Sequence, residues 1–329
     1  ELIKKILDAE EKTEKNINEK TFSILSSPEF LAEGTAISDL ENPDRVLIGG
    51  EDEKALNILG EIYKRWIPES KILFTNLWSS ELSKLTANAF LAQRVSSINS
   101  ISALCEKTGA DISEVAKAVG MDYRIGKHFL KSGPGFGGSC FKKDILNLVY
   151  ISKLYGLNEV ANYWDQVLQI NHWQQNRLTN IIVKKLFGTV TNKKIGILGF
   201  AFKANTNDTR ESPAINICVD LIIEGANLSI LDPKVQANSI LSDLQESVAN
   251  KDMSINVKNQ LEIASSYEQI FSESDAVLVL TEWDDFKNIK WQNMSKLMRK
   301  PSWLFDCRDV VDFKQLRESD IDVWKLGFG

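Results

Sequence analysis

The sequence has 329 residues, a length that favours two or more domains over one. Its formal net charge of −6 argues against bulk nucleic-acid binding, which depends on basic patches that neutralise phosphates. No stretch approaches the roughly 18 uninterrupted apolar residues that indicate a membrane-spanning helix. We therefore expect a globular protein that acts neither on nucleic acid nor within a membrane.

Four cysteines, Cys105, Cys140, Cys218 and Cys307, lie far apart without a Cys-x-x-Cys pair. Only two histidines accompany them, so we expect no metal site. No secretion signal is recognisable, which favours a cytoplasmic protein whose thiols stay reduced. An isolated cysteine in that compartment is either a small buried side chain or a reactive group, and its surroundings decide between the two.

Residues 1–78 show an alternating pattern of strands and helices. Apolar and amphipathic runs predict strands and one helix at residues 21–25, 45–48, 53–66 and 71–75, the third being the helix. Pro28 stops pairing after the first strand, which places Glu29 and Glu33 in a loop. We interpret this section as the remnant of a Rossmann-like domain, most of which is missing from the sequence.

Residues 79–188 are predicted to be all-helical apart from a glycine-rich segment. The pattern predicts helices over 79–107, 111–120, 143–154 and 158–187. Gly109 and Gly120 stand where the first two helices end. Helices of this length pack between subunits as well as within one subunit, so we expect this region to form a dimer core.

Residues 189–329 return to alternating strands and helices. Apolar runs predict strands at 194–199, 227–231, 276–280 and 303–305. Ser212 and Pro213 supply the cap and first turn of a helix that Gly225 ends. This alternation predicts a doubly wound parallel sheet. Gly196 and Gly199 do not satisfy the Gly-x-Gly-x-x-Gly spacing, so we expect a degenerate nucleotide-binding fold.

Cys140 ends the run Gly135-Phe136-Gly137-Gly138-Ser139-Cys140. Glycines at such density are costly in chain entropy and let the backbone approach a ligand closely. If a helix begins here, its dipole and the lysines at 142 and 143 would stabilise negative charge on the sulfur. From the residues alone, a reactive cysteine and a buried cysteine at a turn remain equally good interpretations.

Several polar residues are further candidates. Lys84 and Asn88 stand four apart on one predicted helix, so they share a face and could hold an oxyanion or a water. A solvated lysine is the competing interpretation. Glu29 and Glu33 follow a strand end, where α/β proteins place ligands, but they also fit a solvated acidic loop. Asp144 is either a general base or a charge that complements the helix dipole.

Three cations lie near the carboxyl ends of strands in the last region, where such folds bind ligands. Lys203 and Arg210 follow the first strand, and Arg308 follows the strand at 303–305. Together they suit an anionic ligand such as a phosphate.

Six segments resemble the UDP-glucose/GDP-mannose dehydrogenase family. They occur in the family's order over nearly the whole chain, which is more specific than any single motif. The segments lie at residues 28–36, 42–46, 81–90, 135–144, 199–203 and 208–212.

The resemblance implies conversion of UDP-glucose to UDP-glucuronate, with two NAD and one water consumed. It makes Cys140 the nucleophile that holds the aldehyde intermediate as a thiohemiacetal and then a thioester. Lys84 would stabilise oxyanions, Asn88 would position the substrate, and Glu29 and Asp144 would take part in acid-base steps.

The resemblance also assigns binding roles. Arg124 would reach the site of a neighbouring subunit, which makes a homodimer or higher homo-oligomer necessary. The residues implied to contact the UDP-sugar are Phe30, Leu31, Ala32, Glu33, Lys84, Asn88, Arg124, Phe129, Lys131, Gly133, Phe136, Gly137, Phe202, Lys203 and Arg308. Those implied to face NAD are Glu29, Glu33, Cys140, Lys143 and Arg210.

The resemblance thus implies three domains, at residues 1–78 for NAD, 79–188 for dimerisation and catalysis, and 189–329 for the UDP-sugar. Most of the family's N-terminal domain is missing here, so we expect the chain alone to bind NAD poorly. Two alternatives follow: a UDP-sugar-binding dimerisation fragment without activity, and a dehydrogenase of another nucleotide sugar such as GDP-mannose.

Overall fold

The computed structural model describes residues 3, 5–7, 9, 22–251, 253, 255–316 and 319–329. The chain divides into two compact units, Glu1–Ala87 and Asn88–Gly329. The boundary falls within the long helix α4 (Leu77–Thr108). Within the described part of the chain, no helix combines the length and apolar character needed to cross a membrane.

The first unit is built on two parallel strands. Its elements are α2 (Ala36–Glu41), β1 (Val46–Gly49), α3 (Glu53–Tyr63), the 3-10 turn η1 (Glu69–Lys71) and β2 (Ile72–Thr75). The side chain of Asp52 caps α3 by accepting from the backbone N–H groups of Lys54 and Ala55. Ile48 and Ile67 lie in the small core that the sheet and α3 share.

The prediction of a strand at residues 21–25 is wrong for residues 22–25, which form no strand. Thr21 lies outside the described residues. Only Ser26 pairs, through two antiparallel hydrogen bonds with Gly49. Pro28, two residues later, has no N–H to continue a ladder, and one bridge does not make a strand. The predicted loop at Glu29 is nevertheless present.

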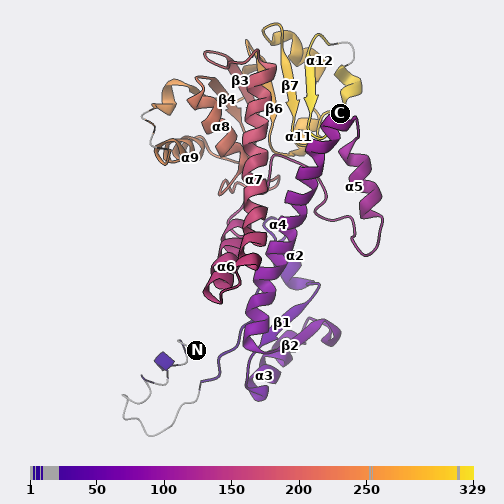
Figure 1. Ribbon diagram of the computed structural model, residues 1–329, viewed down its shortest axis with the longest axis vertical. Helices are drawn as coiled ribbons and strands as arrows, with labels where there is room; N and C mark the ends of the chain where they lie inside the picture. The colour runs from indigo at the N-terminus through magenta and orange to yellow at the C-terminus, as the bar shows by residue number, and fades with distance from the viewer. Residues whose placement is uncertain are drawn as a thin grey trace. The chain divides into compact units, whose positions relative to one another are not determined.

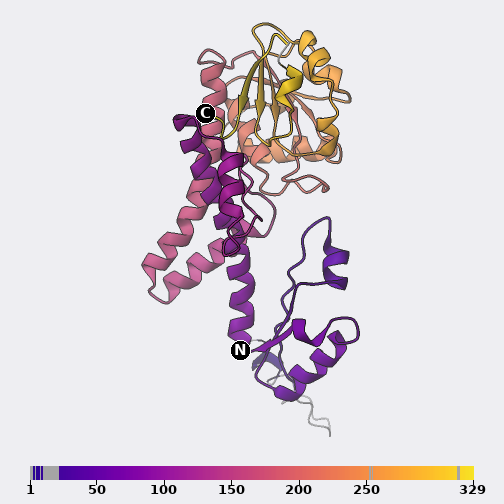
Figure 2. The same cartoon turned by 90° about the vertical axis from the view of Figure 1, so that its right-hand side faces the viewer.

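The central helices belong to the second unit from Asn88 onward. After α4 come α5 (Ile112–Gly120), α6 (Phe141–Leu154) and α7 (Asn158–Lys185). A short turn through Gly156 folds α6 back along α7, and Figure 2 shows the two as a helical hairpin. Ile145 and Ala161 are fully buried where the hairpin packs, so the hairpin has its own apolar core. The helical prediction for this region is confirmed, and every predicted helix end lies within two residues of the observed one.

The C-terminal part is a six-stranded, fully parallel sheet in the order β5-β4-β3-β6-β7-β8. This is the strand order of the doubly wound dinucleotide-binding folds, and it confirms the predicted fold class. The strands are β3 (Lys194–Leu198), β4 (Asn227–Leu231), β5 (Leu261–Ile263), β6 (Ala276–Val279), β7 (Trp303–Asp306) and β8 (Asp322–Lys325) (Figure 1). The connecting helices and turns are α8 (Pro213–Ile223), α9 (Ala237–Ala249), η2 (Val257–Asn259), α10 (Tyr267–Phe271), α11 (Asp284–Lys287), α12 (Trp291–Met294), η3 (Ser295–Leu297) and η4 (Phe313–Leu316).

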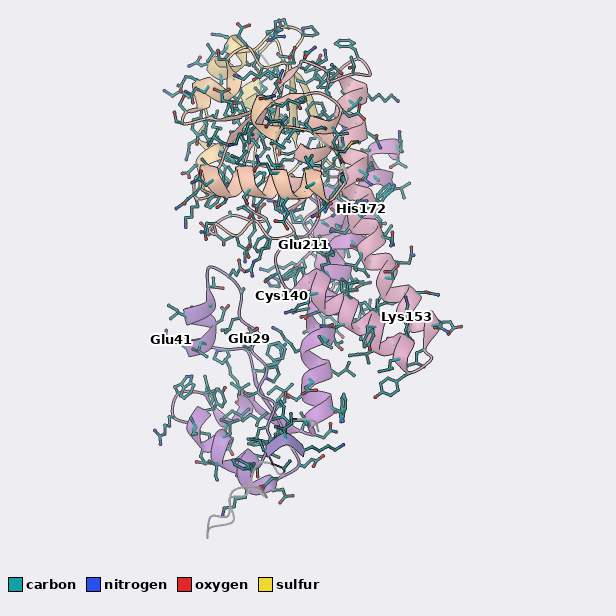
Figure 3. The ribbon with its side chains drawn as sticks, turned by 90° about the vertical axis from the view of Figure 1, so that its left-hand side faces the viewer. Glu29, Glu41, Cys140, Lys153, His172 and Glu211 are labelled. Carbon is teal, nitrogen blue, oxygen red and sulfur yellow. The ribbon has the colours of Figure 1, made fainter. Side chains whose placement is uncertain are left out.

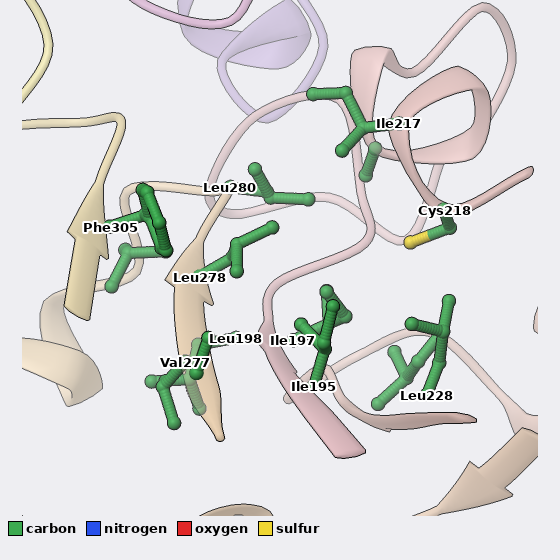
Figure 4. Packing of buried hydrophobic residues seen from close by; sticks show 14 of the residues in the cluster. Ile195, Ile197, Leu198, Ile217, Cys218, Leu228, Val277, Leu278, Leu280 and Phe305 are labelled. Atoms are coloured by element: carbon green, nitrogen blue, oxygen red, sulfur yellow. The ribbon is translucent and has the colours of Figure 1, made fainter. Parts of the chain in front are cut away.

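The core of this sheet is continuous and apolar. Figure 4 shows Ile195 and Ile197 of β3 beside Leu278 of β6, with Ile217 and Cys218 of α8 covering them. The hydroxyl of Ser212 caps α8 and also donates to the carbonyl of Phe200, as its place before Pro213 predicts. The strand order reverses between β3 and β6, so the carboxyl ends of these strands form the usual ligand-binding edge.

Candidate active site

Cys140 is exposed at the N-cap position of α6, where Figure 3 labels it. Cys105, Cys218 and Cys307 are buried, and burial raises the pKa of all three thiols, most strongly for the last two. The structure therefore sets Cys140 apart and excludes the interpretation of a buried cysteine at a turn. Among the described residues, no group of His, Cys, Asp and Glu side chains is arranged to hold a metal ion.

The glycine loop, residues 133–138, lies against the carboxyl end of β3. A Cβ atom on Gly137 would come within 2.5 Å of the Glu211 carbonyl oxygen and 2.8 Å of the Phe202 Cβ. Gly138 has φ +85° and donates its N–H to the carbonyl of Arg210 at 2.8 Å. These two positions require glycine, one for close approach and one for its left-handed backbone. The loop thereby places Cys140 next to the C-terminal sheet.

Asp144 and Asn88 form a buried polar pair in the second unit. Asp144 lies in the first turn of α6 and is 5% exposed, and Asn88 of α4 is 9% exposed. The Asn88 Nδ2 donates to Asp144 Oδ2 at 2.5 Å. The backbone N–H of Asp144 donates to the carbonyl of Cys140. Asp144 is therefore a buried carboxylate with a side-chain partner, and both of its interpretations, a general base and a charge that complements the helix dipole, stay predictions.

Lys84 and Glu29 meet within the first unit. The Lys84 Nζ donates to the Glu29 carbonyl oxygen at 2.6 Å and to its Oε1 at 3.0 Å. The Lys84 side chain is only 20% exposed, so it is not a solvated surface lysine. The same ammonium lies 5.6 Å from the centre of the Phe30 ring, whose other cationic neighbour is Arg45 at 3.8 Å. A lysine, a carboxylate and an aromatic ring are thus gathered in one place.

The rest of the predicted 29–33 segment is an ordered loop. The backbone N–H of Leu31 donates to Glu29 Oε2 at 2.7 Å, and that of Ala32 donates to Asp39 Oδ2 at 2.9 Å. Glu33 is half-buried at the turn before α2. Carboxylates of the first unit thus accept hydrogen bonds from the backbone N–H groups of the loop and fix its conformation, as acidic side chains commonly do in turns.

Phe202, Lys203 and Arg308 gather at the carboxyl edge of the C-terminal sheet, as predicted. Arg308 donates from Nε to the Leu280 carbonyl at 2.8 Å and from Nη2 to the Phe202 carbonyl at 3.2 Å. It also pairs with Glu282 at 3.1 Å. The Lys203 ammonium lies 5.5 Å from the centre of the Phe202 ring.

Gly133 joins this edge to the glycine loop. A Cβ on Gly133 would lie 3.2 Å from an Arg308 guanidinium nitrogen. The structure therefore brings the two ends of the glycine loop to two of the predicted ligand-binding residues, Arg308 and Phe202.

The segment after α5 carries the remaining predicted substrate contacts. Phe129 is exposed, has φ +59° and packs against Phe141 with ring centres 6.3 Å apart. Lys131 lines a cavity of about 270 Å³ that Lys117 and Lys127 also line. Lys325 and Asp309, which form an ion pair, also line it. Four lysines and one carboxylate around one cavity suit an anion.

Arg124 lies earlier in the same segment, and its side chain is 74% exposed. It forms an ion pair with Asp122 at 2.6 Å. The contacts of the Arg124 side chain are thus with a neighbour in its own segment, and the role expected of it in another subunit stays a prediction.

Besides Cys140, two predicted cofactor contacts lie on the second unit. Lys143 is exposed in the first turn of α6, and Arg210 pairs with Asp208 at 2.7 Å while its side chain stays 63% exposed. Lys142 points to a different partner, Glu211, with both distances 2.9 Å. Exposed cations beside a helix N-terminus fit an anionic cofactor such as NAD.

Sequence reasoning missed four side chains that hold these segments. Arg94 donates to the carbonyls of residues 125, 126 and 128 and so fixes the segment before Phe129. Asn99, Asn171 and Gln174 bond the backbone of the glycine loop. The signal that could have found them is polar residues at core positions of long helices, because a buried polar group needs a partner.

Comparison with known proteins gives three family models that match in order. They describe the NAD binding, central and UDP binding domains of the UDP-glucose/GDP-mannose dehydrogenase family, at residues 1–67, 78–173 and 196–313. The predicted boundaries near 78 and 189 remain predictions, since the structure divides the chain once, after Ala87.

Curated relatives are similar over most of the chain. UDP-glucose 6-dehydrogenase 4 of Arabidopsis thaliana is 52% identical over 317 residues, which cover 93% of this chain and 66% of the relative. UDP-glucose 6-dehydrogenase 4 of Oryza sativa subsp. japonica is 51% identical over 338 residues, which cover 99% of this chain and 69% of the relative. The chain thus spans about two thirds of the length of these relatives.

A solved structure agrees with the fold. The UDP-glucose dehydrogenase from the hyperthermophilic archaeon Pyrobaculum islandicum superposes with a TM-score of 0.78 at 29% identity. The match covers 94% of this chain and 64% of that protein.

Proposed function

Since the chain belongs to the UDP-glucose/GDP-mannose dehydrogenase family, we propose that it oxidises UDP-glucose to UDP-glucuronate with Cys140 as the covalent nucleophile. The observation that carries the proposal is the exposure of Cys140 at the N-terminus of α6. The glycine loop that precedes it in the chain packs closely against Phe202 and Glu211 of the C-terminal region. The same fold with a buried Cys140 would offer no nucleophile. The curated relatives carry this activity in their names.

The cysteine solves a specific chemical problem. The first oxidation takes a proton from the C6 hydroxyl and a hydride from C6, which leaves an aldehyde. An aldehyde cannot give up a second hydride directly. Attack of the Cys140 sulfur on the aldehyde carbon forms a thiohemiacetal, whose loss of a proton and a hydride leaves a thioester. Water then cleaves the carbon–sulfur bond, which releases the carboxylate and restores the thiol.

Lys84 and Glu29 supply charge and proton transfer in this scheme. The Lys84 ammonium, held by the Glu29 carbonyl and carboxylate, would stabilise the oxyanions of the two tetrahedral species. Glu29 would handle the water or the proton in hydrolysis, since it is 57% exposed and already polarised by Lys84. Asn88 and Asp144, a buried pair, would orient substrate and accept a proton.

The UDP-sugar and NAD have separate sets of partners. Phe202, Lys203 and Arg308 would hold the UDP moiety at the carboxyl edge of the C-terminal sheet, the usual ligand site of this fold. NAD accepts the hydrides when it is bound. Lys143 and Arg210 would contact its negative charges.

We also propose a homodimer through the central helices. Leu146, Tyr150 and Leu154 repeat every four residues on α6 and are 45%, 66% and 66% exposed. A continuous apolar helix face of this kind marks an interaction surface. Arg124, on the exposed segment after α5, would enter the partner's site. Light scattering should give twice the monomer mass, and Tyr150→Glu should give a monomer.

A cytoplasmic location accompanies this proposal, because an exposed catalytic thiol must stay reduced. Fractionation of the native protein with soluble cytoplasmic markers tests it, and recovery with an oxidising compartment would contradict it.

The central experiment combines a binding and a rate measurement. Calorimetry with UDP-glucose should give binding, and absorbance at the NADH band should rise in the presence of both substrates, with two NADH for each UDP-glucuronate. Binding without NADH formation would favour the alternative of a UDP-sugar-binding dimerisation fragment. This alternative is tested because the chain covers only 66% of the length of the Arabidopsis relative. A preference for GDP-mannose in a substrate panel would overturn the choice of UDP-glucose.

A further inference from the structure

The middle of the glycine loop is bonded at its backbone by one side chain of α7. Asn171 Oδ1 accepts from the backbone N–H of Phe136 at 2.8 Å. The Nδ2 of the same amide donates to the Phe136 carbonyl at 3.1 Å. Asn171 is 9% exposed, so both bonds are shielded from water. One side chain thus satisfies both backbone groups of Phe136 as a neighbouring strand would.

The start of the loop is bonded in the same manner by two helices. The N–H of Gly133 donates to Asn99 Oδ1 of α4 at 2.9 Å. The Gly133 carbonyl accepts from Gln174 Nε2 of α7 at 3.0 Å. Asn99 and Gln174 are both fully buried. The four hydrogen bonds at Gly133 and Phe136 are named the amide clamp below.

Gln174 is itself held in one orientation. Its Oε1 accepts from Arg177 Nε at 3.1 Å, so its Nε2 must face Gly133. Arg177 forms a two-pronged pair with Glu106 at 2.7 and 3.1 Å, with both side chains nearly buried. Glu106 also accepts from the backbone N–H of Gly327. A continuous buried network therefore connects the end of β8 to the glycine loop.

These amides occupy positions where a helix ordinarily carries apolar side chains. Asn171, Gln174 and Gln175 follow the buried Val167 on α7 and precede the buried Leu178. Polar groups on a core-facing stripe cost free energy unless every one is paired, and apolar residues of similar volume are frequently as stable. The stripe is thus poorly explained by stability alone. Asn171 and Gln174 have their partners in the loop that leads to Cys140, whereas Gln175 Oε1 accepts from Asn216 of α8.

We propose that Asn171 and Gln174 are positioning residues, which hold the glycine loop in its working conformation before substrate binds. A free chain with four glycines in residues 133–138 would sample many conformations and would lose entropy on binding. The amide clamp removes that loss beforehand, which keeps the Cys140 sulfur in register with the sugar. The inference rests on the proposed function of Cys140 and names the residues that support it.

Hydrogen exchange of the purified chain tests the clamp without any assay of activity. Asn171→Leu removes both bonds to Phe136 at similar volume, and the exposed Asn180→Leu is the control on the same helix. Amides of the 133–138 segment should exchange at least about tenfold faster in Asn171→Leu, since each lost bond is worth roughly 1 kcal/mol. Exchange in α6 and α7 should be unchanged. Equal exchange of the loop in both variants would overturn the clamp.

A rate measurement tests the positioning role. For Asn171→Leu and Gln174→Leu, kcat should fall by about tenfold to a hundredfold, because small misplacements of reacting groups are costly. Asn171→Asp keeps the acceptor for the Phe136 N–H and should fall less. The exposed Gln166→Leu is the control for Gln174. If the loop amides exchange faster in Asn171→Leu but its kcat equals that of the control variants, Asn171 does not position the loop for catalysis.

Failure of the proposed function would be recognised separately. The unsubstituted protein would then form no NADH, whereas the result of the hydrogen-exchange measurement would not depend on activity. In that case the rate at which iodoacetamide modifies Cys140 replaces kcat. It should fall severalfold in Asn171→Leu, as the unclamped sulfur turns away from its exposed position at α6. A rate equal to that of Asn180→Leu would overturn the proposal. If Asn171→Leu does not fold, Asn171→Asp and Gln174→Leu carry the same tests.

Discussion

Cysteines have opposite environments at the start of α6 and in the core of the C-terminal sheet. At α6, a loop held by side-chain amides leaves Cys140 exposed beside a helix N-terminus. In the core that covers the sheet, Cys218 of α8 and Cys307, which follows β7, are fully packed among apolar side chains, and burial raises the pKa of both thiols. The difference teaches that the exposure of a thiol, which its reactivity requires, depends here on the backbone that supports it.

The sharpest way to break this contrast is Cys140→Ser. A serine hydroxyl is a far weaker nucleophile than a thiol and does not form the thioester, so under the proposed function turnover to UDP-glucuronate should fall by about 10⁴-fold or more. The measurement is NADH formed per UDP-glucose at saturating NAD.

The matched control is Cys105→Ser, which removes a buried thiol outside the proposed site. If it folds, Cys105→Ser should give the same NADH yield as the unsubstituted protein. A near-normal yield from Cys140→Ser would remove the thioester from the mechanism.

Thiol modification reports the same contrast without turnover. Iodoacetamide should modify Cys140 at least about 10³-fold faster than Cys218 or Cys307, because the buried thiols react only through unfolding that costs several kcal/mol. Mass spectrometry of peptides from the native protein gives the three rates. Comparable rates would mean that the sheet opens far more readily than its packing indicates.

Lys84→Ala extends the test to the first unit. The ammonium is held by two Glu29 oxygens and is poised to stabilise an oxyanion, so its loss should lower kcat by about 10²- to 10³-fold. UDP-glucose affinity, measured by calorimetry, should change little. Lys64→Ala, which breaks a surface pair with Glu61 in the same unit, is the control. An unchanged kcat in Lys84→Ala would take Lys84 out of the reaction.

Much of the fold could be predicted because its signals are local. The apolar run of β3 and the Ser212-Pro213 start of α8 gave elements close to those observed. β5 and β8 went unpredicted, since β5 has only three residues and only two of the four residues of β8 are apolar. The strand wrongly expected before Ser26 was an apolar run without a partner strand.

The candidate site was predicted less completely, for a physical reason. Cys140 and its glycines are adjacent in sequence, so their chemistry is visible in one motif. Asn99, Asn171 and Gln174 reach the loop from residues 34 to 41 positions away. Only the packing of α4 and α7 reveals that link. Periodicity marks such amides as exceptions to an apolar stripe, but it does not identify their partners.

The smallest predicted effect is the alkaline instability of the sheet. The ordinary thiol pKa is 9.0, and burial holds the pKa of Cys218 well above it in the folded protein. Above pH 9 the unfolded chain therefore loses a proton that the folded chain keeps, so stability falls as pH rises, by about 1.4 kcal/mol per pH unit for one thiol. Cys218→Ala should flatten the slope of unfolding free energy between pH 9 and 10.5 by that amount in urea titrations. Val219→Ala, the buried neighbour, should lower stability at every pH and leave the slope alone. Equal slopes in both variants would mean that Cys218 ionises in the folded protein, and that its packing does not protect it.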